Sequence, residues 1–241
     1  MKLMVSPQMN ANKASIHYSR LLAFICGLYS VAALLPAAAS APQTPPVDPV
    51  FEHPASARDL EKMLGPATQA LRQAAALRGE FSQRKFLHEL PQPLVSSGDF
   101  LVARGLGVIW HTRVPFDSEL VLTPQALVQR DAGAEALRVD AATQPGLGAV
   151  AQVFDALFAL DLPQLGQRFS LYGEPGKDGW ILGLKPREAA LAQAMSAVVV
   201  QGRAEPQHIV LHEASGDRTE IEFSHQTAAA SLSDAERQRF K

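Results

Sequence analysis

Short apolar runs set between glycines and prolines fill residues 79–130, and they constrain the fold more than any other feature of the chain. These runs include Gly79-Glu-Phe-Ser-Gln83 and Ser97-Gly-Asp-Phe100, in which apolar residues lie among polar ones. A period of two residues is typical of β-strands whose two faces differ in environment. Gly105 and Gly107 supply a tight turn between two of the runs. The pattern predicts consecutive antiparallel strands at 79–89, 96–104, 107–113, 118–123 and 126–130, with a weaker strand at 135–139.

Helical periodicity interrupts this series of strands. Apolar residues at i, i+3, i+4, i+7 and i+8 predict an amphipathic helix over 150–158. An earlier helix begins at Ser56 and is kinked or split at Pro66, and Ser233 begins a short helix that extends to Phe240. Alternation returns afterwards and predicts further strands at 169–172, 180–184, 195–201, 207–213 and 218–224.

Roughly ten strands with two amphipathic helices among them predict a mainly β fold of the α+β kind. An antiparallel sheet of this size tends to curl or close on itself. If the sheet curls, its concave face becomes a trough on which the apolar faces of the helices can lie. Periodicity alone does not distinguish an ordinary packed interior from a cavity for a ligand, so both interpretations stay open.

The first 41 residues have the organisation of a secretory signal. Basic residues precede the mostly apolar run 21–35, and small residues ending at Ala41 follow it. This run is shorter than the roughly 20 residues of a membrane-spanning helix. The basic region before it is long, however, so an uncleaved N-terminal anchor is the alternative. We predict cleavage near Ala41, a proline-rich solvated linker over 42–55 and a single domain over 56–241.

The cysteine content and the charge narrow the function classes. Cys26, the only cysteine, follows Ile25 inside the apolar run, where a lipid-attachment site is not expected. Cleavage would leave no cysteine, which excludes disulfides, thiolate nucleophiles and cysteine-ligated zinc. Cleavage would also remove three basic residues and no acidic one, so the net charge would fall from −2 to −5. A mildly acidic chain without a basic stripe argues against binding to nucleic acid or to anionic membranes.

Residues suited to catalysis or metal binding form no recognisable motif. Ser82 lies in no nucleophile elbow, and Glu220 and Glu222 share a strand face that solvation explains. His208 and His212 lie about 13 Å apart along a strand, too far for one metal ion. The sequence therefore predicts no enzyme activity, no cofactor and no metal site.

Arg104 is the most informative charged residue. It shares strand parity with Phe100 and Val102, which predicts that its side chain points towards the apolar face. A guanidinium on that face needs hydrogen-bond acceptors, because burying an unpaired charge is costly. Backbone carbonyls at a helix end would serve, and such a contact could hold a helix over the sheet. The alternative is an arginine at a strand end whose head group reaches water.

The order and spacing of these motifs resemble the periplasmic outer-membrane lipoprotein carrier proteins of the LolA type, and more closely their divergent LolA-like branch. The resemblance covers about residues 75–225. It departs from the usual pattern at Gly105, where the family usually has proline, and at Val108, where it has phenylalanine. The matching residues are Phe81-x-Gln83, Gly98-x-Phe100, Arg104, Trp110, Pro115 and Leu120-Val121.

The resemblance implies a strongly curved antiparallel sheet, an incomplete β-barrel, covered by lid helices. It implies a monomeric periplasmic carrier that takes acyl chains of a lipoprotein or another lipid from an inner-membrane transporter to an outer-membrane acceptor. Arg104 is implied to be a latch that holds the lid. The alternative is a periplasmic sensor or adaptor domain of the same fold, which binds a partner protein or detects mislocalised lipids. The predicted lining of the hydrophobic cavity is Phe81, Phe100, Val102, Val108, Trp110, Leu120, Leu122, Val150, Phe154, Leu157 and Phe158.

Overall fold

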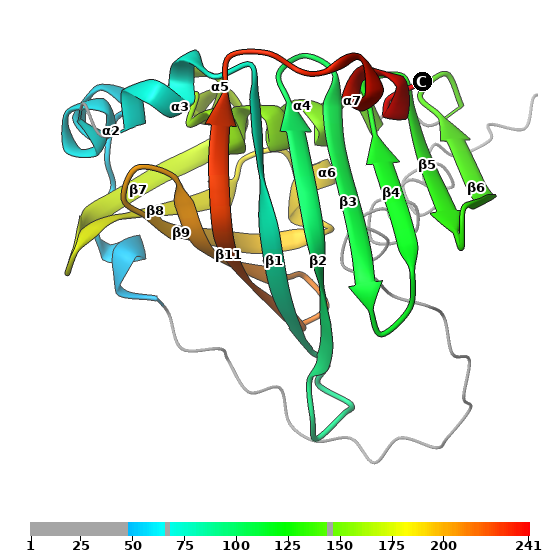
Figure 1. Ribbon diagram of the computed structural model, residues 1–241. Helices are drawn as coiled ribbons and strands as arrows, with labels where there is room; N and C mark the ends of the chain where they lie inside the picture. The colour runs from blue at the N-terminus through cyan, green and yellow to red at the C-terminus, as the bar shows by residue number, and fades with distance from the viewer. Residues whose placement is uncertain (1–47, 66–67, 144–146) are drawn as a thin grey trace, which may run out of the picture.

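The computed structural model describes residues 48–65, 68–143 and 147–241, and within them the chain forms one antiparallel sheet with helices on both sides (Figure 1). The predicted signal over 1–41 lies outside the described residues. The strands are β1 (Ala76–Phe86), β2 (Leu94–Ala103), β3 (Gly107–Val114), β4 (Ser118–Leu122), β5 (Ala126–Asp131), β6 (Ala134–Asp140), β7 (Phe169–Gly176), β8 (Gly179–Pro186), β9 (Met195–Gly202), β10 (Pro206–Glu213) and β11 (Arg218–Ala229).

The strand order is β6-β5-β4-β3-β2-β1-β11-β10-β9-β8-β7. Two meanders, β1–β6 and β7–β11, are therefore joined where the first strand pairs with the last. Edge strands β6 and β7 lie at opposite ends of this order and do not pair, so the sheet curves without closing (Figure 1). The predicted incomplete barrel is confirmed.

Helices occupy both faces of the sheet. The 3₁₀-helix η2 (Pro49–Glu52) precedes α2 (Ala57–Leu64) and α3 (Gln69–Gln73) at the N-terminal end. We call α4 (Leu147–Ala159) and α5 (Leu162–Arg168) the lid helices, because their side chains pack on the concave face. The remaining helices are α6 (Ala189–Ala192) and α7 (Asp234–Arg239), the second with the capping box that Ser233 forms with Glu236.

Helix α5 was not expected, because Pro163 and Gly166 resemble helix breakers in the sequence. Pro163 instead lies in the first helical turn, where its missing N–H leaves no hydrogen bond unmade. Asp161 caps the helix by accepting a 3.0 Å hydrogen bond from the Gln164 N–H. The helix predicted over 150–158 is consequently followed by a second helix that also packs on the concave face.

Residues 48–55 differ from the solvated linker that their prolines predict. Val50 is 0% exposed, and a Cβ at Gly183 of β8 would lie 2.9 Å from its side chain. The Ala55 N–H donates to the Leu171 carbonyl of edge strand β7 at 3.0 Å. A sheet edge offers unpaired backbone groups, and prolines are compatible with pairing there. This part of the proline-rich segment therefore covers the edge of the sheet.

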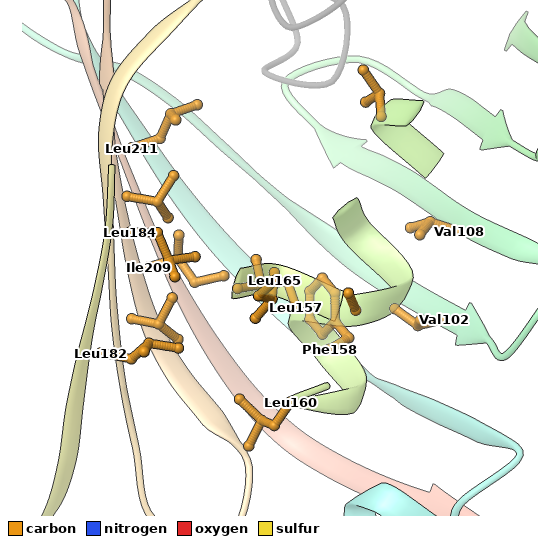
Figure 2. Close-up of a cluster of buried hydrophobic side chains, with 14 of the residues drawn as sticks. Val102, Val108, Leu157, Phe158, Leu160, Leu165, Leu182, Leu184, Ile209 and Leu211 are labelled. Atoms are coloured by element: carbon orange, nitrogen blue, oxygen red, sulfur yellow. The ribbon is translucent and has the colours of Figure 1, made fainter. Parts of the chain in front are cut away.

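The main apolar core lies between the concave face and the lid helices. Figure 2 shows side chains of the lid helices between two walls of the sheet, with Val102 and Val108 on one side and Leu182 and Leu184 on the other. A smaller cluster on the convex face includes Ile109 and Val121, and Leu232 and Phe240 at the C-terminal end cover it. Strand side chains alternate between faces. Successive residues of one strand therefore belong in turn to the main core and to the convex cluster.

Candidate functional site

The predicted lining residues meet on the concave face. Strand pairing places Phe100 opposite Trp110, and Val102 opposite Val108, so the same parity runs from strand to strand. All eleven belong to the main core, Phe154 as a partly buried member at its border. Shared parity explains the proximity of the seven strand residues, and the four residues of α4 come from one apolar face of that helix.

Aromatic rings form the centre of this surface. The rings of Phe81 and Trp110 stack with centroids 4.0 Å apart, although strand β2 lies between their strands. Gly98, directly opposite Phe81 on β2, has no side chain to separate them. Phe158 of lid helix α4 packs 5.8 Å from Phe100 and 5.5 Å from Phe223, centroid to centroid. The lid is thus anchored on aromatic side chains.

Phe223 and the opposite wall of the trough were missing from the sequence prediction. Phe223 is buried and touches the rings of Phe100, Trp110 and Phe158. Its alternation with Glu220 and Glu222 could have identified it as an inward residue. The same argument applies to the other buried residues of this wall, which are Trp180, Leu182, Leu184, Val198, Val200, Ile209 and Leu211.

Two small cavities lie among the described residues of the trough. A cavity of about 10 Å³ is enclosed by Val108, Trp110, Leu120, Leu122 and Phe154. A cavity of about 20 Å³ lies at the end of α4 beside Arg104. Each is about the size that holds one water molecule. Neither of these two cavities has room for an acyl chain.

Arg104 follows the last residue of β2 and contacts the helical region. Its Nη2 donates to the Leu71 carbonyl of α3 at 3.5 Å, the long limit for a hydrogen bond. Its backbone N–H donates to the Ala75 carbonyl at 2.9 Å. The residue is also exposed. Arg104 therefore contacts a helix carbonyl, as the first interpretation expects, while its side chain lies at the surface, as the alternative expects.

Asp155 of α4 lies on the other side of the cavity that Arg104 lines. Burial raises the pKa of the Asp155 carboxyl, and a hydrogen bond from the Gly105 backbone N–H and the charge of Arg104 oppose that rise. Gly105 has φ +71°, a conformation that proline cannot adopt, and proline has no N–H to donate. The turn after β2 thus contacts both α3 and α4.

Groups of three or more His, Cys, Asp or Glu side chains that could hold a metal ion do not occur in the part of the chain that the structure describes. In the same residues, no helix is long and apolar enough to cross a membrane.

An open antiparallel sheet whose apolar concave face is covered by helices defines the class of fold. The family follows from the sequence of residues 72–239, which match the family described as outer membrane lipoprotein carrier protein LolA. This match spans more than half of the chain, and the chain belongs to the LolA family. Its members are periplasmic carrier or binding proteins rather than enzymes.

Similar solved structures are distant in sequence. A LolA superfamily protein from Nitrosomonas europaea is 11% identical, with a TM-score of 0.40 over 75% of this chain and 96% of the other. A putative outer membrane lipoprotein-sorting protein domain from Vibrio parahaemolyticus is 9% identical, with a TM-score of 0.39 over 75% and 98%. These scores are low, so the family assignment rests on the sequence match. No curated protein matched the chain.

Proposed function

We propose that this chain is a periplasmic carrier that binds the acyl chains of a lipoprotein or another lipid beneath the lid helices and carries them from the inner to the outer membrane. The observation that supports it best is an apolar concave face covered by a lid whose contacts with that face are themselves apolar. Apolar burial is non-directional, so an acyl chain can replace the lid side chains without a specific geometry.

The free energy of burying an acyl chain exceeds the free energy needed to lift the lid helix. Lifting α4 exposes side chains such as Phe154, Leu157 and Phe158 at about 1.5–3 kcal/mol each, or about 5–9 kcal/mol together. An acyl chain that buries about 15 CH₂ groups gains about 12 kcal/mol at about 0.8 kcal/mol per group. The difference is a few kcal/mol in favour of binding. An affinity of that size allows the cargo to be passed on.

Arg104 is the proposed latch of the lid. Its guanidinium contacts the α3 carbonyl of Leu71, and its neighbour Gly105 donates to Asp155 on α4. Breaking these contacts would release the helical region from the end of β2. In the proposed cycle, the signal is cleaved near Ala41, an inner-membrane transporter loads the open monomer, and an outer-membrane acceptor receives the cargo.

Native mass spectrometry of the protein purified from the periplasm, followed by organic extraction, tests the proposal. We expect a bound acylated species, whose mass separates a lipoprotein from another lipid. A mass equal to the protein alone, with no uptake of added lipopeptide or phospholipid, would refute the carrier function and support a sensor or adaptor domain of the same fold.

A further inference from the structure

A charged pair lies on the concave face of the sheet, away from the lid contacts. The side chain of Lys85 on β1 is 1% exposed, and its Nζ donates to Glu213 Oε1 at 2.8 Å. Glu213, at the end of β10, has a side chain that is 11% exposed. Lys85 shares strand parity with Phe81, so both point to the face that carries the aromatic rings.

The ion pair of Lys85 and Glu213 spans strand β11 on the concave face of the sheet. Strand β11 lies between β1 and β10, so the two residues are about two strand spacings, or roughly 10 Å, apart at the backbone. Thr219 of β11 is directly opposite Lys85, and its hydroxyl donates to the same Glu213 oxygen at 3.2 Å. The ammonium group therefore reaches over Thr219, along the concave surface, rather than out to solvent.

This arrangement is expensive for a purely structural role. A buried ion pair stabilises a fold little more than apolar side chains of similar size do. An apolar residue at this position would also extend the apolar surface of the trough. A lysine ammonium has three N–H donors. Within the described residues, Glu213 is the acceptor that the structure gives it. Lys85 thus retains the capacity to donate to a further anionic oxygen.

We propose that Lys85 is the subsite for an anionic group, a carboxylate or phosphate oxygen, of an acylated cargo whose chains lie against the aromatic rings. This inference rests on the proposed carrier function and specifies its cargo. Lys85 lies four residues from Phe81, about 13 Å along the strand. An amphiphile would lie with its head group at Lys85 and its chain along β1, and Glu213 would neutralise the ammonium when no cargo is bound.

Two matched variants test the assignment in the full purified protein. Lys85→Met removes the charge and keeps the length of the side chain, whereas Glu213→Gln removes the competing carboxylate and keeps an acceptor for Lys85 and Thr219. Dissociation constants are measured for three amphiphiles with the same palmitoyl chain: palmitate, palmitoyl lysophosphatidic acid and the neutral monopalmitoylglycerol. The readout is the ratio of anionic to neutral affinity, which distinguishes a subsite for anions from a general loss of binding.

The wild-type protein is expected to prefer an anionic probe about tenfold, the effect of one charge-assisted hydrogen bond. Lys85→Met should bring the ratio to about one, and Glu213→Gln should raise it. The anionic probe with the larger ratio identifies the carboxylate or the phosphate as the preferred group. If Lys85→Met does not fold, the direction of the Glu213→Gln change still decides.

Other outcomes overturn the inference. An unchanged ratio in Lys85→Met, or an unchanged or lower ratio in Glu213→Gln, would mean that the pair only stabilises the curvature of the sheet. Equal binding of all three amphiphiles by the wild-type protein would remove the subsite and leave the carrier function standing. Uptake of none of them would remove the carrier function itself, and the subsite with it.

Discussion

Phe158 provides the most direct test of the lid. Its side chain is 2% exposed and packs against the rings of Phe100 and Phe223. Truncation to alanine in a packed environment costs about 3–5 kcal/mol. Since Phe158 is on α4 and its partners are on the sheet, the cost falls on the closed arrangement and not on an opened one. Phe158→Ala should therefore shift the opening equilibrium by more than about a hundredfold.

Native-state hydrogen exchange measures this opening, because each amide of α4 reports its own opening free energy. We expect amides of α4 to exchange much faster in Phe158→Ala while the central strands keep most of their protection. Uptake of a lipopeptide should accelerate in parallel, since less free energy is needed to lift the helix.

Ile109→Ala is the matched control. Ile109 is 1% exposed, but it belongs to the small cluster on the convex face, away from the lid. Its truncation costs a comparable amount, about 2–5 kcal/mol, and should raise exchange through global unfolding without selecting α4. If both variants changed α4 exchange and lipopeptide uptake equally, the idea of an independently opening lid would be wrong.

Three further predictions concern the borders of the trough. Arg104→Leu should fold normally, lose the contact with α3 and fail to release cargo in a transfer assay; normal release would eliminate the latch. Burial raises the pKa of Asp155, so its contribution to stability is full below the ordinary value of 3.8 and is lost as pH rises through the raised pKa. Asp155→Asn should therefore be at least as stable as wild type in urea unfolding at pH 7 and should lose any advantage towards pH 3; a less stable variant at pH 7 contradicts this reasoning. Gly183→Val should push Val50 off the sheet at a cost of about 1–3 kcal/mol, seen as faster proteolysis within 48–55 than in Gly148→Ala, whose added Cβ meets only the Pro124 carbonyl oxygen at 3.5 Å.

The alternation of side chains was sufficient to predict most of the sheet. Short apolar runs between turn residues identified β3 and β4, and strand parity assigned Trp110 and Leu122 to the concave face, although Ile109 and Val121 are buried on the convex face. The number of strands indicated that the sheet would curl or close, and the resemblance to LolA carriers specified an incomplete barrel.

The remaining features depend on partners that are distant in the sequence. Val50 is buried because edge strand β7 and Gly183 provide a surface for it, and neither is visible from a proline-rich segment. Lys85 has no local signal of burial, since its carboxylate partner is 128 residues away and two strands across. Helix α5 has a local signal, but a misleading one, because Pro163 and Gly166 suggest that helical structure ends there.

The pairing of β1 with β11 has a consequence for how the molecule acquires its structure. Each meander can form from neighbouring strands, but their union requires residues from the two ends of the sheet-forming chain, such as Phe81 and Phe223. Contacts of such long sequence separation form slowly. Until β11 is inserted, β1 and β10 are unpaired edges next to half-covered apolar surfaces, a combination prone to aggregation. Folding should therefore be rate-limited by the last strand, and shortening the chain before β11 should yield an insoluble product rather than a smaller carrier.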